Sequence, residues 1–314
     1  MSRYQALTAA AAATTYLLIV AGAVVRVSGS GLGCPDWPLC HGGVVPPPDI
    51  AAIIEFSHRF IAGADSLLIL GVVGLTLASR RNEPRLMAPG ILVPLLLAGQ
   101  IVLGAVTVLL ELPPYVVLVH LALAMAILGL LVWMSVQASS RRAVGGLTLN
   151  DGRGFVRWTA VAVALAFVLA MTGALVRASG ASWACIGFPA CNGEFAPFGR
   201  NLLTDLQLVH RLLAYLTAGV LLVVLVSGWR RRVAYPGLDK ALVALGVTLG
   251  AQIVIGAAAV STDLPAVLRG LHVAGAAAVW SSAVAVFSLV SRGHRVIEGV
   301  ATRRPLLTRE AVGS

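Results

Sequence analysis

Eight long apolar stretches constrain this chain more than any other feature of its sequence. A helix needs about 20 mainly apolar residues to cross the hydrocarbon core of a bilayer. Of the 314 residues, 58% are hydrophobic and 11% are charged, which is unlike a soluble domain. The stretches cover residues 6–26, 51–78, 87–109, 114–136, 156–177, 203–228, 238–260 and 265–290. We therefore predict an all-α integral membrane protein with eight transmembrane helices, the first of them retained and not cleaved as a signal peptide.

The basic residues are concentrated in alternate connecting segments. The net charge is +10, and 17 of the 23 Lys and Arg residues lie in these segments. By the positive-inside rule the segments are cytoplasmic, so both termini lie inside and the loops at 27–50 and 178–202 lie outside. This placement indicates a multi-pass protein of a bacterial cell (inner) membrane. The net positive charge is then a consequence of how the chain lies in the lipid bilayer, and no nucleic-acid partner is expected.

The two parts of the chain repeat each other. Residues 21–40 match residues 172–191 at an offset of 151, and Gln100 matches Gln252 at an offset of 152. Each copy holds four spans, an even number, so both copies enter the membrane from the same side. We therefore predict two tandem-duplicated four-helix bundles in parallel orientation. They are an N-terminal half at 1–145 and a C-terminal half at 146–314 that ends in a basic cytoplasmic tail.

All four cysteines lie in the two outer loops. Cys34 and Cys40 enclose five residues, as do Cys185 and Cys191, and a proline lies inside each gap. On an oxidising face of the membrane such pairs usually form disulfides. We predict Cys34–Cys40 and Cys185–Cys191 bonds, the second as a structural link. A redox-active dithiol is the alternative for the first pair, because exposed disulfides are the reducible ones.

Four of the six histidines lie within spans, two in each half and all at a similar depth. Ionisable residues inside a membrane usually mark function, and imidazoles on two facing helices of a bundle commonly hold haem iron. We predict that the haem-iron ligands are His58, His120, His210 and His272. The other two, His41 and His294, have no partner in the repeat and are expected to be solvated.

Arginines near the histidines favour haem over a bare metal ion. Arg26 and Arg177 are repeat equivalents at the outer ends of spans, and Arg59 and Arg211 each follow a histidine directly. Guanidinium groups suit carboxylates, so these four residues are predicted to bind haem propionates. The alternative for Arg26 and Arg177 is that their side chains simply reach toward the membrane surface. Gly104 and Gly256 are expected to serve close helix packing.

The motif Glu55-Phe-Ser-His58-Arg59, the other three span histidines and a Cys-x5-Cys pair in each half resemble haem A synthase, over residues 10–290. The resemblance implies an oxidoreductase of haem biosynthesis and cytochrome oxidase assembly. It implies that His210 and His272 ligate a resident haem B. It also implies that His58 and His120 receive haem O, whose C8 methyl is oxidised to the formyl group of haem A. Gln207 departs from the pattern, since the carboxylate of Glu55 occurs in one half only.

That difference predicts a division of labour between the halves. Glu55 lies three residues before His58 on one helix face, where a carboxylate can stabilise charge or accept a proton, and Gln207 cannot accept one. Asp65 is two turns further along the same helix, with Thr217 as its equivalent, and is either a polar contact between helices or a proton relay. Catalysis is therefore assigned to Glu55, His58 and His120.

Two other functions stay open at the level of sequence. One is a two-haem membrane electron-transfer cytochrome, and the other is a membrane thiol oxidoreductase that uses Cys34 and Cys40. The residues do not identify the electron acceptor, a quinone or another carrier, or whether the chain forms a homo-oligomer. The haem O synthase that makes the substrate is a further candidate partner.

Overall fold

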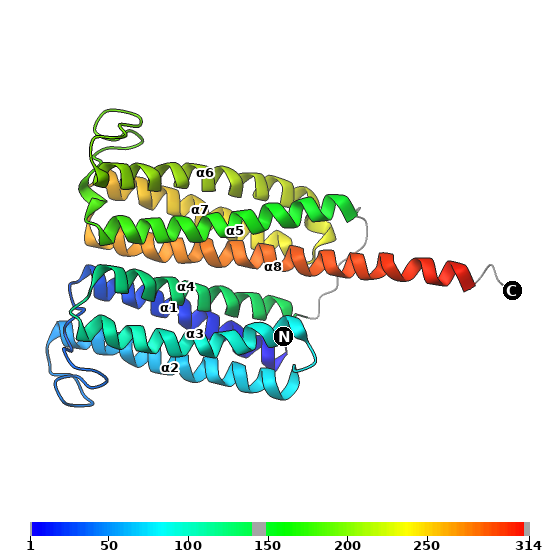
Figure 1. Ribbon diagram of the computed structural model, residues 1–314, viewed down its shortest axis with the longest axis horizontal. Coiled ribbons are helices and arrows are strands. Elements are labelled where there is room, and N and C mark those ends of the chain that lie inside the picture. The colour runs from blue at the N-terminus through cyan, green and yellow to red at the C-terminus, as the bar shows by residue number, and fades with distance from the viewer. Residues whose placement is uncertain (1, 140–148, 311–314) are drawn as a thin grey trace.

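A computed structural model describes residues 2–139 and 149–310 of the chain, and within them the structure is helical (Figure 1). The first half contains α1 (Arg3–Val27), α2 (Ile50–Ser79), α3 (Pro84–Leu109) and α4 (Pro114–Gln137). The second contains α5 (Leu149–Ala178), α6 (Leu202–Arg231), α7 (Leu238–Ser261) and α8 (Ala266–Glu310), with short 3-10 turns η1 (Ala181–Trp183) and η2 (Arg232–Ala234).

The eight predicted spans agree with the helices. Among the described residues, eight helices are long and apolar enough to cross a membrane. The chain is therefore a multi-pass membrane protein, as predicted. The C-terminal segment differs from the expectation of a loose tail, since α8 continues to Glu310 and projects beyond the bundles (Figure 1). Extending a helix that already exists costs far less than starting one, so α8 runs past the end of its apolar stretch.

Side-chain caps determine where the two histidine-bearing helices α2 and α6 begin. Asp49 accepts a hydrogen bond from the Ala52 N–H at 3.0 Å, and Asn201 accepts one from the Thr204 N–H at 2.9 Å. Asp and Asn are preferred at this position because their oxygens satisfy free N–H groups of the first turn. His58 and His210 each lie eight residues beyond the first helical residue, about 12 Å along the axis. The caps therefore place both histidines at the same depth.

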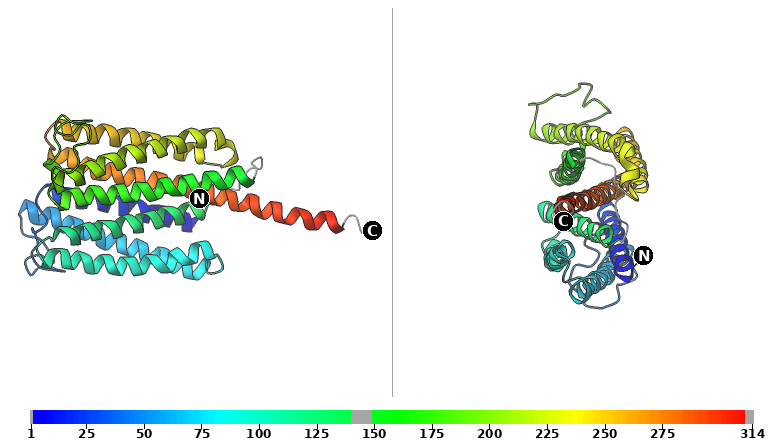
Figure 2. Two further views of the ribbon diagram at one scale, coloured as in Figure 1. Left: turned by 45° about the horizontal axis from the view of Figure 1, so that its top comes forward. Right: turned by 90° about the vertical axis from the view of Figure 1, so that its right-hand side faces the viewer.

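The helices form two groups of four, α1–α4 and α5–α8, which lie side by side (Figures 1 and 2). The long loops after α1 and α5 lie at the same end of the molecule, and the N-terminus lies toward the other end (Figure 1). Such an arrangement is expected of two parallel repeats. The predicted boundary between residues 145 and 146 lies outside the described residues, and the duplication itself stays a prediction from the sequence.

Helices α4 and α8 form the seam between the two groups (Figure 2). Across it, Trp280 Nε1 donates to Met125 O at 2.9 Å, and Gln137 Nε2 donates to Ser288 O at 3.1 Å. Gly129 lets Trp280 approach, since a Cβ there would lie 2.9 Å from the indole ring. The same buried core contains residues of both seam helices, such as Leu131 and Ala277. Helix α8 is thus a core element of both halves.

Candidate functional site

The four span histidines form two pairs, one in each group of helices. His58 on α2 interacts electrostatically with His120 on α4, and His210 on α6 interacts with His272 on α8. His120 and His272 each lie six residues beyond the first residue of their helix, about 9 Å along it. The structure therefore brings the predicted ligands together as one pair per half.

A glycine on a neighbouring helix lies against each imidazole ring. A Cβ added to Gly22 or Gly173 would lie 3.1 Å or 3.0 Å from Cε1 of His58 or His210, respectively. Gly104 and Gly256 have the same relation to His120 and His272, at 3.3 Å and 3.0 Å. The prediction that Gly104 and Gly256 serve close packing is confirmed, and the group they pack against is the predicted ligand. Gly22 and Gly173 were missed, although they lie within the repeated segment.

Amide side chains on α3 and α7 contact one histidine of each pair. Gln100 Nε2 lies 3.2 Å from His120 Nε2, and Gln252 Nε2 lies 3.4 Å from His272 Nε2 and donates to His272 O at 3.1 Å. Among the four span histidines, Nδ1 of His58, His120 and His272 is buried and has no hydrogen-bond partner in the part of the chain that the structure describes. Buried polar atoms are usually paired, so imidazoles left this way are suited to an additional ligand.

These pairs fit haem better than a bare ion. A porphyrin supplies four nitrogen ligands of its own, so the protein needs to add only one or two axial imidazoles. In the part of the chain that the structure describes, His, Cys, Asp and Glu side chains form no group of three that could hold a metal ion. Two imidazoles in each bundle, with a glycine beside each ring, are the donor set that haem requires.

Glu55 is buried where the first outer loop meets α2. Its side chain is 4% exposed; one oxygen pairs with Arg59 at 2.6 Å, and the other accepts the Cys34 N–H at 3.1 Å. Gly33 allows this approach, because a Cβ there would lie 2.3 Å from the backbone of Ala51. The carboxylate is therefore held rigidly one turn before His58.

Arg59 and Arg211 hold the two outer loops. Arg59 donates to the carbonyl oxygens of Cys34, Asp36 and Leu39, each at 2.6 Å. Arg211 donates to the carbonyl oxygens at 185, 187 and 190, at 3.0, 2.9 and 2.7 Å. Gln207, the equivalent of Glu55, leaves its buried Oε1 without a partner. Both arginines thus bind their loops, and propionate binding by them stays a prediction.

Replacing Arg211 with Ala is expected to loosen the second loop by about 2–3 kcal/mol, because three carbonyl groups, one buried and two part-buried, lose a charged donor. The measurement is the thermal unfolding midpoint in detergent, with limited proteolysis within 178–202. Arg200→Ala is the control, since Arg200 is 54% exposed and pairs only with exposed Glu194. Equal effects of the two substitutions would contradict a special role for Arg211.

The predicted disulfides Cys34–Cys40 and Cys185–Cys191 are confirmed, with Cα–Cα distances of 4.6 and 4.7 Å. In the first loop, Asp36 accepts the N–H groups of Gly42 and His41. These bonds, that of Gly42 first, lower the pKa of the Asp36 carboxyl below its ordinary value. Holding the loop in place thus also fixes a negative charge beside Arg59.

The sequence also led to predictions for His41, His294 and Asp65. His41 is exposed as expected, but the prediction for His294 was wrong, because α8 continues and buries its ring beside Gly152 of α5. Asp65 is buried and accepts a hydrogen bond from Thr15 on α1 at 2.9 Å. The polar contact between helices is therefore present, and the proton relay stays a prediction.

Arg26 and Arg177 lie in the last turns of α1 and α5, at the end of the molecule that carries the disulfide loops (Figure 1). Arg177 interacts electrostatically with Arg26 and with Arg269 on α8, a residue that the repeat could not reveal because position 117 is Val. Helices α1 and α8 pack together here, since a Cβ on Gly270 would lie 3.7 Å from the Val27 side chain. Three cations near the outer end of the seam favour binding of carboxylates there.

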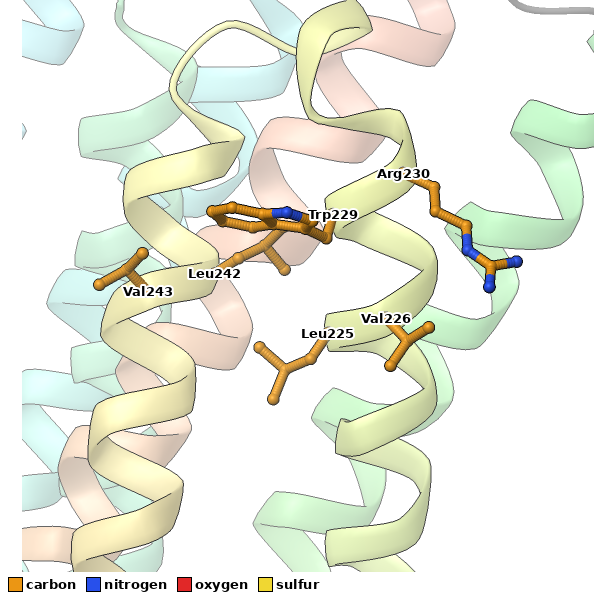
Figure 3. A pocket seen from close by; sticks show the side chains of 6 residues that line it. All are labelled: Leu225, Val226, Trp229, Arg230, Leu242 and Val243. Atoms are coloured by element: carbon orange, nitrogen blue, oxygen red, sulfur yellow. The ribbon is translucent and has the colours of Figure 1, made fainter.

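A hydrophobic groove lies between α6 and α7 (Figure 3). It encloses about 380 Å³ and is lined by Leu225, Val226, Trp229, Arg230, Leu242 and Val243. Leu225 is 15 residues beyond His210 on α6, a distance of about 22 Å along the helix. The groove therefore belongs to the opposite end of the bundle and takes no part in the histidine site.

Comparison with known proteins shows which family the chain belongs to. A family model of cytochrome oxidase assembly proteins, COX15-CtaA, matches residues 5–284. A heme A synthase of Shouchella clausii is 31% identical over 218 residues, which is 67% of this chain and 71% of the relative. One of Symbiobacterium thermophilum is 35% identical, with 63% and 66% covered, and one of Shewanella oneidensis is 28% identical, with 84% and 89% covered. This chain belongs to the COX15-CtaA family of cytochrome oxidase assembly proteins.

Proposed function

We propose that this chain is a haem A synthase, a membrane oxidoreductase that converts a methyl group of haem O into the formyl group of haem A. The observation that carries the proposal is the difference between two otherwise matched histidine pairs. Buried Glu55 precedes His58, whereas Gln207 precedes His210. A carboxylate can accept a proton and an amide cannot, so the N-terminal half is equipped for proton-coupled chemistry. The heme A synthases among its relatives support the same function.

The C-terminal half is proposed to hold a resident haem B between His210 and His272. Both rings have polar contacts: His210 Nδ1 lies 3.1 Å from the hydroxyl of Thr172, and His272 Nε2 lies 3.4 Å from the amide nitrogen of Gln252. Haem in this position would supply a one-electron redox centre. The protein's part is to fix both imidazoles at one depth and to exclude water with the loop that Arg211 holds.

The N-terminal half is proposed to bind haem O as substrate, between His58 and His120. Arg26 and Arg177 lie toward the outer end, where they would pair with propionates of the two macrocycles. Glu55 pairs with Arg59 at 2.6 Å, and its carboxylate is proposed to take the proton of a water molecule that attacks the methyl carbon. Arg59 keeps the carboxylate in place while the loop carbonyls share its charge.

The balance of the reaction is two successive oxidations. The first removes two electrons and two protons from the methyl group and one water molecule, which gives the alcohol. The second repeats this with another water, and the geminal diol then loses water to form the aldehyde. We propose that the four electrons leave through an external acceptor, a quinone or another carrier, and that haem O comes from the enzyme that makes it.

The proposed orientation puts both termini in the cytoplasm of a bacterial cell and the disulfide loops outside its inner membrane. In the structure the Arg-rich turns after α2 and α6 lie at the end opposite the disulfide loops (Figure 1). Disulfides persist on oxidising faces, and basic turns favour the cytoplasm.

The test is the haem content of cells that make haem O but no haem A. Expression of the protein is expected to convert extracted haem O into haem A, as resolved by chromatography. If the protein accumulates with bound haem B while haem O stays unchanged, the proposal fails, and a two-haem electron-transfer cytochrome becomes the better interpretation.

A further inference from the structure

Thr172 on α5 makes a contact that has no equivalent in the first half. Its hydroxyl oxygen lies 3.1 Å from Nδ1 of His210, and the hydroxyl donates to Leu169 O at 2.9 Å. A hydroxyl has one proton to donate and two lone pairs that accept. Because the proton is engaged by Leu169, the oxygen can only accept from the ring.

The direction of this bond determines the tautomer of His210. The ring must carry its proton on Nδ1, which leaves a lone pair on Nε2 for a metal. Histidines that bind metals almost always donate their other N–H in this way, which fixes the ring orientation and raises the basicity of the ligand nitrogen. Thr172 therefore prepares Nε2 of His210 for axial ligation.

In the described part of the first half, no hydroxyl group accepts a hydrogen bond from Nδ1 of His58 in this way. Ala21 occupies the position equivalent to Thr172 at an offset of 151, and Nδ1 of His58 is buried without a partner. The surroundings otherwise correspond, since Leu18 matches Leu169 and Gly22 lies against His58 as Gly173 lies against His210. At this position of the equivalent helices α1 and α5, the two sites thus differ by the hydroxyl group of Thr172.

We propose that Thr172 is a positioning residue that makes the C-terminal site retain its haem, and that Ala21 leaves the N-terminal site free to release its haem. This inference rests on the proposed function, in which one haem is resident and the other is exchanged. A substrate site must let its product leave, and a ligand whose ring is not fixed holds iron less tightly.

Thr172→Val tests the proposal, because valine has nearly the same shape without the hydroxyl. The purified protein is mixed with excess apomyoglobin, and the loss of resident haem is followed by absorbance. We expect the half-life of resident haem to fall about 10- to 100-fold, as is typical for loss of such a partner, and the reduction potential to rise. Thr172→Ser should restore both values. Wild-type retention and potential in Thr172→Val would overturn the proposal.

The reciprocal variant is Ala21→Thr in a His210→Leu background, which removes the resident haem. We expect haem added to this double variant to stay in the N-terminal half about 10- to 100-fold longer than in His210→Leu alone. An unchanged half-life would overturn the explanation for release. Two other outcomes are distinguishable from this one: full resident haem signal in His210→Leu by itself refutes the assignment of the resident site, and unchanged haem O in cells that express the protein refutes the proposed function.

Discussion

Glu55→Gln is expected to reduce formation of haem A by about 10²- to 10⁴-fold while the protein still folds and keeps its resident haem B. The carboxylate lies one turn before His58 on α2, and an amide cannot accept the proton of the attacking water. The first disulfide loop is expected to keep its position without the carboxylate. The second loop is the precedent, because Arg211 holds it although Gln207 stands at the equivalent position. A loss of activity in Glu55→Gln therefore reports on chemistry more than on loop structure.

The measurement is pigment extraction and chromatography from cells that carry each variant. Accumulation of haem O would show that the first oxidation depends most on Glu55, and accumulation of the alcohol would show that the second does. Gln207→Glu is the matched control, since it places a carboxylate beside the other histidine pair and should leave the rate of haem A formation nearly unchanged. If Glu55→Gln makes haem A at the wild-type rate, the N-terminal half is not the catalytic half.

His210→Leu and His272→Leu are each expected to abolish the absorbance of low-spin haem B in the purified protein. Leucine approximates the volume of the ring but offers no lone pair to iron, and the second imidazole alone leaves one axial position empty. His58→Leu and His120→Leu should keep that absorbance and stop conversion of haem O. The two pairs thus separate binding of the cofactor from turnover of the substrate.

The control for these four variants is retention of both disulfides and of the elution volume in detergent, which shows that the bundle is intact. The measurement is the visible spectrum of reduced protein, together with haem quantified per polypeptide. Full haem B in either C-terminal variant would refute the assignment of the resident site. Equal loss in all four variants would show that the two halves do not differ in the way we propose.

Features set by local pattern were predictable from the sequence. The eight spans follow from hydropathy alone, and the disulfides follow from two short gaps in the outer loops. The histidine pairs also emerged, because equal depth and an offset of 152 place them on corresponding helices. These predictions depend on spacing along the chain, which a helix converts directly into position.

Contacts across the bundle were not predictable. The sequence suggested that Arg59 and Arg211 point at haem, whereas their guanidinium groups bind loop carbonyls that no sequence pattern marks. The contact between Thr172 and His210 was not predicted for the same reason, although the mismatch of Thr172 with Ala21 in the repeat was a detectable signal. His294 was misjudged because hydropathy marks the end of an apolar stretch, while a helix can continue past it and bury a polar ring.

The position of α8 in the seam has a consequence for biosynthesis. Gln137 on α4 is buried and donates a hydrogen bond to Ser288 on α8, a residue 151 positions later in the chain. At about 5–20 residues per second, the ribosome needs roughly 8–30 s to add the residues between them. During that interval the first bundle is in the membrane without the helix that packs against its α4 flank. The nascent chain therefore passes through a stage at which insertion factors or chaperones can shield that flank, before the last helix arrives.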